Sequence, residues 1–212
     1  MNETLTLATL LLAGYLLGSL SGSLLLGRFF GVDVRRTGSG NAGGTNALRA
    51  RGIGFALPVV LIDVGKGAAG ALLPLLWPAL APATSVAPVW LGAGCALAAV
   101  AGHIFPIFFG FRGGKGAGTY VGALAVLQPV ALAALVVAWL ACLVSTGIVG
   151  LSTILAVAAA MVCAVVLPGI GGKVFALSAG LLVIAAHHSN IHRLRQGTEP
   201  RFEAARLFGK RR

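Results

Sequence analysis

The sequence predicts an all-α integral membrane protein with seven transmembrane helices, its N-terminus outside and its C-terminus in the cytoplasm. Three observations carry this prediction: 58% of the 212 residues are hydrophobic, only 10% are charged, and the mean hydropathy is +0.95. A soluble domain carries about 25% charged residues, whereas a transmembrane helix needs about 20 apolar residues in a row. The composition therefore excludes an ordinary water-soluble globule and leaves short loops and helix ends for polar chemistry.

The apolar runs predict the spans in order. They are expected near 5–27, 53–77, 87–109, 119–128, 129–146, 148–167 and 173–187. The run over 119–146 is divided because it contains Gln128-Pro129, and a proline removes a backbone donor from a helix. The piece 119–128 is only about 15 Å long, so it must borrow loop residues or cross part of the membrane. The first run exceeds the apolar core of a signal peptide, so it is expected to be retained.

The net charge of +11 is unevenly distributed. Five of the 16 Lys and Arg lie in 28–51, two in 112–115 and seven in 193–212. By the positive-inside rule these clusters mark cytoplasmic segments, namely loops 31–51 and 110–118 and the tail 188–212. With one span before loop 31–51, two more before loop 110–118 and four more before the tail, these three segments lie on the same side of the membrane. Such clusters attract anionic lipid or phosphorylated substrates, whereas nucleic acid requires a water-exposed basic face, so no nucleic-acid partner is expected.

The first of three polar islands runs from Thr37 to Asn46 and is followed by Arg49. Its glycines imitate a dinucleotide-binding loop, but no strand precedes them, as that motif requires. A glycine-rich loop with a nearby arginine suits an anion, and a flexible interfacial loop is the alternative. The hydrogen-bonding side chains of this island are Ser39, Asn41, Thr45 and Asn46.

The second island surrounds Lys115 with glycines. Backbone N–H groups can approach phosphate closely in such a loop while the lysine supplies charge. It is not a Walker A loop, because Phe109 stands where that motif needs glycine. A histidine just before this island is either a packing residue or a functional group at membrane depth. The residues of interest are His103, Gly113, Gly114, Lys115, Gly116, Gly118 and Thr119.

The third island runs from His187 to Glu199, with Asn190 one helical turn after His187. His188 and His192 are four residues apart and could share a metal, but no cysteine or carboxylate completes such a site. The alternative to a metal site is a basic segment that lies on anionic lipid headgroups. Neither a metal nor a cofactor is expected.

Two further features lie within the apolar runs. Asp63 and Lys66 are three residues apart and can pair on one helix face, either for structural neutralisation or as part of a site. Cys95, Cys142 and Cys163 lack CxxC spacing and are read as small buried hydrophobes.

In order and spacing, the three islands resemble the three motifs of the PlsY family, the bacterial acyl-phosphate-dependent glycerol-3-phosphate acyltransferases. The matching segments are Ser39-Gly-Asn-x-Gly-x-Thr-Asn46, then Gly102-His-x-x-Pro106 with Phe111-x-Gly-Gly-Lys-Gly116, then His187-x-x-Asn190 through Glu199, together with Asp63-x-x-Lys66-Gly67. The likeness covers essentially the whole chain. Gly44 replaces a common alanine and His188 a common arginine, so His188 is assigned no role.

The resemblance implies transfer of a fatty acyl group from acyl phosphate to the sn-1 hydroxyl of glycerol-3-phosphate, giving lysophosphatidic acid and inorganic phosphate for phospholipid synthesis. It implies a monomeric multi-pass protein of the bacterial cytoplasmic (inner) membrane, with its active site facing the cytoplasm. Expected catalytic residues are Ser39, Lys115, His187 and Asn190. Expected substrate-binding residues are Asn41, Thr45, Asn46, Arg49, Lys66, His103, Gly113, Gly114, Gly116, Gly118, Thr119 and Glu199.

Within this site we expect Lys115 and its glycines to bind the phosphate of the donor, and Ser39, Asn46 and Arg49 to hold glycerol-3-phosphate. His187 is either a general base or a polar anchor for the acceptor. The anchor is favoured because no carboxylate follows at the usual spacing to orient the ring, although Asp63 or Glu199 could fold close to it.

Three other functions compete with this one. A purely structural membrane subunit would not need three polar, glycine-rich islands on one side. The acyl-CoA-dependent enzymes use His followed five positions later by Asp, and no histidine here has that partner. A membrane transporter of a phosphorylated small metabolite is the alternative function. It should place polar groups near the bilayer midplane and show paired repeats, whereas the polar groups of this sequence cluster at one membrane face and no internal repeat is visible.

Overall fold

The computed structural model describes residues 3–76 and 85–202, and every regular element in these two ranges is helical. The helices are α1 (Glu3–Gly18), α2 (Gly22–Phe29), α3 (Gly44–Arg51), α4 (Ile53–Leu76), α5 (Pro88–Ile104), α6 (Ala117–Leu127), α7 (Pro129–Thr146), α8 (Val149–Val166), α9 (Ile170–Ala186) and α10 (His188–Arg195), with 3-10 turns η1 (Val34–Arg36) and η3 (Ile107–Phe109). The prediction of an all-α fold is therefore confirmed for the described residues.

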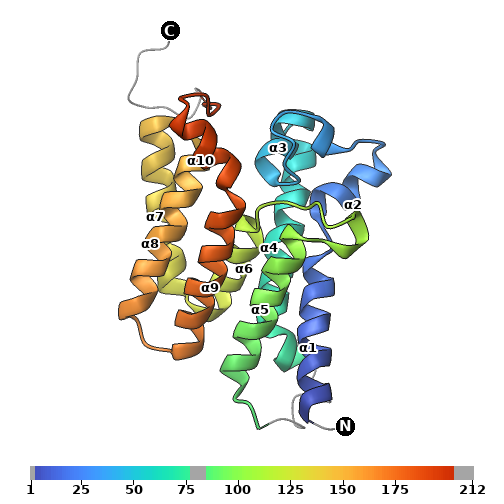
Figure 1. The fold of residues 1–212 in the computed structure, drawn as a ribbon, viewed down its shortest axis with the longest axis vertical. Helices are drawn as coiled ribbons and strands as arrows, with labels where there is room; N and C mark the ends of the chain where they lie inside the picture. The colour runs from blue at the N-terminus through green and yellow to red at the C-terminus, as the bar shows by residue number, and fades with distance from the viewer. Residues whose placement is uncertain (1–2, 77–84, 203–212) are drawn as a thin grey trace.

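The long helices run side by side in one bundle (Figure 1). α4 packs against α5 and α6, and α1 packs against α5. α7 and α8 form a hairpin, and α9 joins it to the rest by packing against both α8 and α5. The short helices α3 and α10 lie at the same end of the bundle (Figure 1). Two polar segments far apart in the sequence thus meet at one end.

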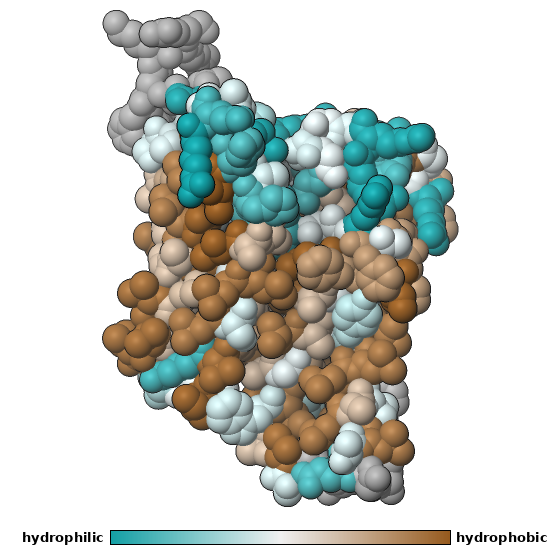
Figure 2. Space-filling model, in the orientation of Figure 1, coloured by the Kyte–Doolittle hydropathy of each residue, from teal (hydrophilic) through white to brown (hydrophobic). Residues whose placement is uncertain are grey.

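The surface has the layering of a membrane protein. A broad apolar zone covers the middle of the molecule, and polar residues gather at the end that carries α3 and α10 (Figure 2). Four described helices are long and apolar enough to cross a bilayer: α4, α5 with its η3 extension, α7 and α8. The pairs α1–α2 and α9–α10 also qualify if each bent pair is one span. The described residues therefore contain four to six candidate membrane spans.

The first expected span, 5–27, contains a break between two helices. α1 ends at Gly18, α2 begins at Gly22, and their axes differ by 53°. The ammonium of Lys66 donates to the carbonyl of Leu20 at 3.0 Å, and the N–H of Gly22 donates to the Asp63 carboxylate at 3.1 Å. A broken backbone is tolerated at membrane depth only where it is buried in protein. The polar pair of α4 thus satisfies the groups that the break frees.

Other boundaries also differ from the expectation. α5 ends at Ile104 rather than 109, α9 begins at Ile170 rather than 173, and α10 is bent 54° from α9. The expected loop 31–51 contains η1 and α3, and the expected tail contains α10. These short polar helices carry no apolar run that would mark them in the sequence. Residue 77 of the second expected span and residues 203–212 of the tail lie outside the described residues.

The division of the long apolar run falls at the proline. α6 ends at Leu127, α7 begins at Pro129, and Gln128 lies between them. The side-chain amide of Gln128 donates to the carbonyl of Pro168 at 2.9 Å. This contact joins the break to the turn between α8 and α9. It also gives the buried amide of Gln128 a hydrogen-bond partner.

Small residues set the distance between helices in the core. A Cβ built on Gly122 of α6 would collide with the carbonyl oxygen of Val64 in α4, and one on Gly18 of α1 with that of Ala99 in α5. Tyr120 and Phe175 stack with ring centroids 5.6 Å apart, and the Tyr120 hydroxyl donates to the carbonyl of Ala176. Close backbone approach, as in other membrane helices, joins α4 to α6 and α1 to α5, and the Tyr120 side chain joins α6 to α9.

We predict that Gly122→Ala lowers the melting temperature of the purified protein, because the new methyl group forces α4 and α6 apart. Overpacking costs about 1–3 kcal/mol, and the expected fall is at least about 2 °C. Gly54→Ala in α4 is the control, since nothing lies within 4 Å of its Cβ position. An equal effect of both changes in a thermal melt would contradict this packing.

Candidate functional site

A cavity of about 520 Å³ opens at the polar end of the bundle. All three polar islands contribute to its wall, from the loop before α3, the start of α6, and α10. Its other wall is apolar and comes from α4, α6, α7 and α8. The polar lining includes Ser39, Asn41, Thr45, Asn46, Arg49, Asp63, His103, Lys115, His187, Asn190, Arg193 and Glu199, and the apolar lining includes Val60, Val121, Leu135, Trp139, Leu140 and Val157.

Asn46 shapes the first polar loop rather than offering its amide to a ligand. Its Nδ2 donates to the carbonyls of Val34 at 2.7 Å and Thr37 at 3.0 Å. Its Oδ1 accepts the N–H of Ser39 at 3.0 Å, and the side chain is 1% exposed. The expectation that Asn46 binds substrate is corrected in this respect, because both of its N–H groups are already used. It positions Ser39, which is exposed at the cavity.

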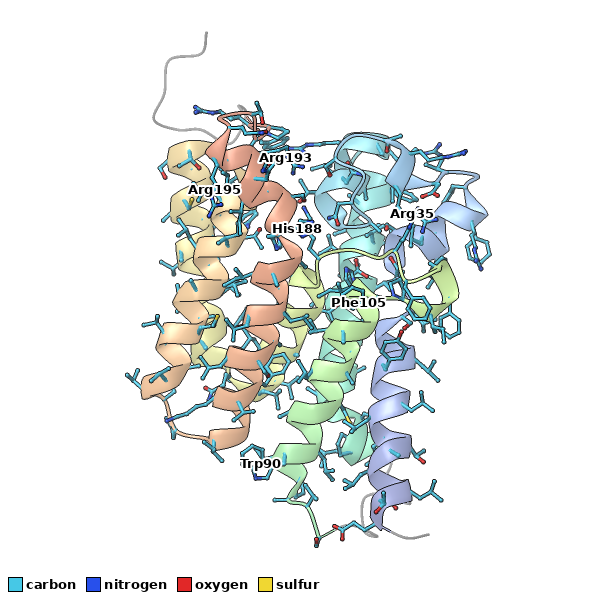
Figure 3. All side chains as sticks on the ribbon, viewed as in Figure 1. Arg35, Trp90, Phe105, His188, Arg193 and Arg195 are labelled. Carbon is cyan, nitrogen blue, oxygen red and sulfur yellow. The ribbon has the colours of Figure 1, made fainter. Side chains whose placement is uncertain are left out.

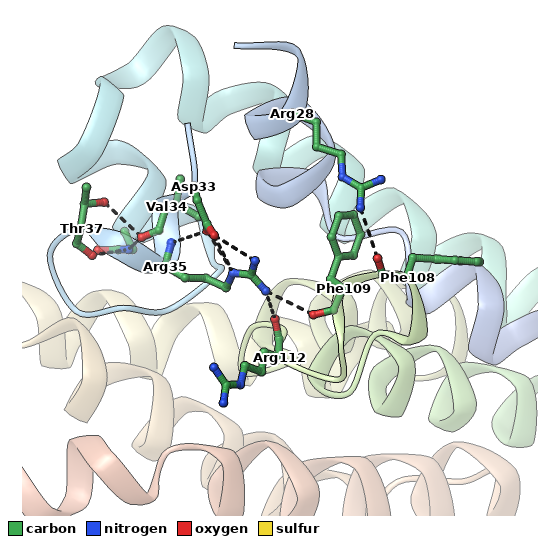
Figure 4. A network of polar contacts seen from close by, with 9 residues as sticks. Arg28, Asp33, Val34, Arg35, Thr37, Phe108, Phe109 and Arg112 are labelled. Carbon is green, nitrogen blue, oxygen red and sulfur yellow. Dashed lines mark hydrogen bonds and ion pairs between the residues drawn. The ribbon is translucent and has the colours of Figure 1, made fainter. Parts of the chain in front are cut away.

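Arg35 connects the first polar loop to the second (Figure 4). Its guanidinium forms an ion pair with Asp33 at 2.9 Å and donates to the carbonyls of Phe109 and Arg112, both at 3.2 Å. The hydrogen bond from Arg35 lowers the pKa of the Asp33 carboxyl. Arg28 donates to the carbonyl of Phe108 (Figure 4). Arginines that the sequence marks only as cytoplasmic charge thus hold two loops together.

The glycines before Lys115 do not offer free donors, contrary to the expectation. The N–H of Gly113 donates to the carbonyl of Ile104 at 3.2 Å, and that of Gly114 to the carbonyl of His103 at 3.1 Å. A Cβ on Gly113 would collide with the carbonyl oxygen of His103, and one on Gly114 with its ring nitrogen Nε2. These glycines therefore allow the loop to lie directly against the end of α5.

Two helix N-termini supply backbone donors in their place. α3 begins after Gly43 and α6 after Gly116, and neither has a side-chain cap. The first N–H groups of a helix have no partner within it, and that end of the helix dipole attracts anions. Residues of both first turns line the cavity: Gly44 and Thr45 of α3, and Ala117 and Gly118 of α6. The cavity can therefore hold an anion between two helix ends and the cationic side chains.

A chain of hydrogen bonds joins the second and third islands. The ammonium of Lys115 donates to Oδ1 of Asn190, whose Nδ2 donates to Glu199 at 2.6 Å. Arg193 donates to the other carboxylate oxygen of Glu199 at 2.7 Å. Glu199, expected to bind substrate, has both oxygens occupied by protein groups. It fixes the orientation of the Asn190 amide, so that its oxygen faces Lys115.

His187 has one ring nitrogen committed to the backbone. Its Nδ1 lies 2.7 Å from the carbonyl of Val183, and a carbonyl can only accept, so the proton of the neutral ring is on Nδ1. Nε2 remains as an acceptor on a side chain that lines the cavity and is 5% exposed. Within the described residues neither Asp63 nor Glu199 hydrogen-bonds this ring.

Asp63 lies at the centre of a buried cluster beside the cavity. One of its oxygens is 3.1 Å from Nζ of Lys66 and 3.4 Å from Nδ1 of His103, and it also accepts the N–H of Gly22. All three side chains are 3–5% exposed. Asp63 and Lys66 pair as their spacing allows. The Asp63 Cβ also lies where a side chain on Gly118 would make contact at 3.2 Å, so the cluster supports the start of α6.

Several expected site residues lie away from this cavity. Gly113 and Gly114 line a smaller neighbouring cavity. Lys66 is turned to Asp63 and Leu20, Thr119 is buried at the contact with Gly67 of α4, and Gly116 packs on Val100 and Ile104. None of these last three lines either cavity. Lys66, Gly116 and Thr119 therefore support the fold around the site and do not form its wall.

The apolar wall was not identified from the sequence. Trp139 and Leu140 of α7 and Thr153 and Val157 of α8 line the cavity, yet in the sequence they look like any lipid-facing residue. Trp139 donates to the Thr153 hydroxyl at 3.3 Å. In the described ranges no three His, Cys, Asp or Glu side chains gather as metal ligands, and the three cysteines are free. An anion-binding end joined to an apolar wall suits a ligand with a phosphate head and an acyl chain.

Comparison with known proteins connects this chain to one family. A family model described as glycerol-3-phosphate acyltransferase matches residues 8–197. A glycerol-3-phosphate acyltransferase from a Synechococcus species is 43% identical over 200 residues, covering 93% of this chain and 95% of the relative. A glycerol-3-phosphate acyltransferase 2 from Bacillus cereus is 38% identical over 196 residues, covering 91% and 93%.

Solved structures agree with the sequence relatives. The crystal structure of PlsY (YgiH), an integral membrane glycerol 3-phosphate acyltransferase, in its glycerol 3-phosphate form superposes with a TM-score of 0.82 at 32% identity, covering 96% of this chain and 99% of that one. The lysophosphatidic acid form of the same protein gives a TM-score of 0.80 at 32% identity, covering 92% and 94%.

We predict that Asp63→Asn or Lys66→Gln alone destabilises the protein, and that the double variant is more stable than either single one. Removing one partner of a buried ion pair costs about 3–5 kcal/mol because the other charge stays unpaired. Thermal melts of the three variants test this. Additive losses in the double variant would contradict a coupled pair.

We predict that sulfate, a phosphate mimic of constant charge, binds more weakly as the pH rises from about 7 to about 9. Burial and the charge of Arg193 together lower the pKa of Lys115 to about 8, against the opposing charge of Glu199. The ammonium is thus present below this pKa and lost above it. Lys115→Arg, which stays charged, should bind with a flatter pH dependence, and equal slopes in titration calorimetry would contradict the assignment.

Proposed function

The chain belongs to the glycerol-3-phosphate acyltransferase family, and we propose that it transfers a fatty acyl group from acyl phosphate to the sn-1 hydroxyl of glycerol-3-phosphate. The products are lysophosphatidic acid and inorganic phosphate, and the activity serves phospholipid synthesis. The observation that carries this proposal is the cavity that joins Lys115, Arg49 and two helix N-termini to an apolar wall on α7 and α8. It offers sites for phosphate and for an acyl chain side by side.

The chemistry needs little from the protein beyond positioning. The acceptor hydroxyl attacks the carbonyl carbon of the donor, an ester C–O bond forms, and the bond from that carbon to the phosphate oxygen breaks. Phosphate is a good leaving group, and the departing phosphate takes up the hydroxyl proton. Lys115 and the first-turn amides of α6 stabilise the charge that develops on it. No cofactor enters this scheme.

The geometry of the first and third islands supports a site for the acceptor. Arg49 pairs with the phosphate of glycerol-3-phosphate in a two-pronged arrangement, and Ser39, placed by Asn46, binds next to it. Nε2 of His187 accepts a hydrogen bond from a hydroxyl of glycerol-3-phosphate, because Nδ1 already donates to the carbonyl of Val183. Because the departing phosphate takes up the hydroxyl proton, His187 acts as an anchor in this scheme, and Asn190 holds Lys115 beside it.

We further propose that the chain crosses the bacterial inner membrane seven times as a monomer surrounded by lipid. The crossings are α1 with α2, α4, α5, α6, α7, α8 and α9, with α6 crossing only part of the bilayer. Arg35, Arg193 and Arg195 lie at the end that carries the cavity, and Trp90 at the other end (Figure 3). The positive-inside rule assigns the arginine end, and with it the active site and the C-terminus, to the cytoplasm.

A transfer assay tests this function. The purified chain is given radiolabelled glycerol-3-phosphate with either an acyl phosphate or the matching acyl-CoA, and labelled lipid is counted. We expect product with acyl phosphate alone. Product with acyl-CoA alone, or with neither donor, would overturn the proposal.

We predict that Arg49→Lys raises the apparent KM for glycerol-3-phosphate about tenfold while the KM for acyl phosphate changes less. A lysine cannot reproduce the two-pronged contact of arginine with phosphate. Arg51→Lys, on the same helix but outside the cavity, is the matched control. A larger rise in the KM for acyl phosphate than in the KM for glycerol-3-phosphate would reverse the assignment of the two phosphate sites.

We predict that His187→Asn raises the KM for glycerol-3-phosphate but retains kcat to within about tenfold. A general base typically contributes about 10²–10⁴-fold to the rate, so its loss would reduce kcat far more. His192→Asn, at an exposed position on α10, serves as the control. Near-total loss of kcat with unchanged acceptor binding would instead assign His187 as the base.

A further inference from the structure

A second cavity of about 410 Å³ lies on the other side of the Lys115 loop. It is bounded by the first polar loop, the segment after α5, and the junction of α9 and α10. Many of its lining residues are exposed, Arg112 and His188 among them, so the cavity opens at the protein surface. The lining includes Ser39, Asn41, Phe105, Phe111, Arg112, Gly113, Gly114, Lys115, Ala185, His188 and Ser189.

The charges around this cavity are of one sign. Arg112 and Lys115 line it together with His188, and no Asp or Glu is among its lining residues. The first cavity, in contrast, includes the carboxylates of Asp63 and Glu199. A small dianion would meet no nearby carboxylate in the second cavity, and guanidinium and ammonium groups are the usual partners of phosphate oxygens.

The two cavities share a wall. Ser39, Asn41 and Lys115 line both of them, so an anion beside Lys115 has the first cavity, with its apolar wall, on one side and the second cavity on the other. The proposed reaction, on which this inference rests, leaves inorganic phosphate beside Lys115 while the lipid product still fills the first cavity. The phosphate therefore needs a route to water that does not pass the acyl chain.

We propose that the second cavity is an inorganic phosphate site through which the leaving phosphate reaches the cytoplasm, with Arg112 and His188 as its outer binding residues. Phosphate passes from Lys115, which belongs to both cavities, to Arg112 and His188 near the solvent. His188 projects from the start of α10 at this polar end (Figure 3). This gives His188 a role that the sequence did not assign.

The backbone around Arg112 is fixed independently of its side chain. The N–H of Phe111 donates to the carbonyl of Pro106 at 2.9 Å, and that of Gly113 to the carbonyl of Ile104. The carbonyl of Arg112, not its guanidinium, accepts the hydrogen bond from Arg35. Phe111 adopts a φ of 59°, uncommon for a residue with a side chain, which these bonds maintain. Replacing the exposed Arg112 side chain therefore leaves the loop in place.

The test measures inorganic phosphate binding to the detergent-purified chain saturated with lysophosphatidic acid, which imitates the state after transfer. Titration calorimetry compares the wild type with the double variant Arg112→Ala/His188→Ala. We expect binding about tenfold weaker in the double variant, from the loss of charge-assisted hydrogen bonds. Arg195→Ala on α10, outside both cavities, is the charge-matched control and should bind within about twofold of wild type.

The outcomes separate this inference from the proposed function. Unchanged phosphate affinity in the double variant, or an equal loss in the Arg195→Ala control, would overturn the second site. A wild-type chain that binds phosphate through Arg112 and His188 but transfers no acyl group would retain the anion site and overturn the reaction.

A second arm identifies the source of the phosphate group. The same titration is repeated in bilayer discs of phosphatidylcholine and of phosphatidylglycerol. Equal affinity in both lipids supports a site for free phosphate. Strong competition by phosphatidylglycerol, lost in the double variant, would show that a lipid headgroup occupies the cavity and would overturn the release route.

Discussion

The buried carboxylate of Asp63 is the contact on which the arrangement of this protein depends. It accepts the N–H of Gly22 and lies within 3.1 Å of Lys66 and 3.4 Å of His103, so it connects the start of α2 with α4 and α5. Lys66 in turn binds the carbonyl of Leu20. Unsatisfied backbone groups cost several kcal/mol in the absence of water. The pair therefore stabilises the break between α1 and α2.

The site follows from the same cluster. His103 lies under Gly114, and Asp63 lies against Gly118, so the cluster forms the base on which the Lys115 loop and the start of α6 rest. Arg35 joins this loop to the first polar loop, and Asn190 holds Lys115 from the other side. Three segments distant in the sequence thus place their cations and helix ends around one cavity. The wall on α7 and α8 then adds room for an acyl chain, which makes acyl transfer to a phosphorylated alcohol the activity that fits.

Much of this could be predicted from local pattern. A proline predicts the break at Gln128, charge placement predicts that the three islands meet at one end, and spacing predicts the pairing of Asp63 with Lys66. Contacts between distant segments could not be predicted. The residues around Gly113 in the sequence do not indicate whether its backbone approaches a phosphate or the carbonyl of His103. The roles of Asn46 and Glu199 as supports depend on partners several residues away, and the apolar wall is invisible because its side chains resemble those that face lipid.

A structure of this chain with glycerol-3-phosphate and a non-hydrolysable acyl phosphonate bound together would locate both substrates. We expect the phosphonate within hydrogen-bonding distance of Lys115 and the start of α6, the acyl chain along Trp139 and Val157, and the phosphate of the acceptor at Arg49. A phosphonate bound away from Lys115, or an acyl chain lying between α1 and α5, would contradict this placement of the substrates.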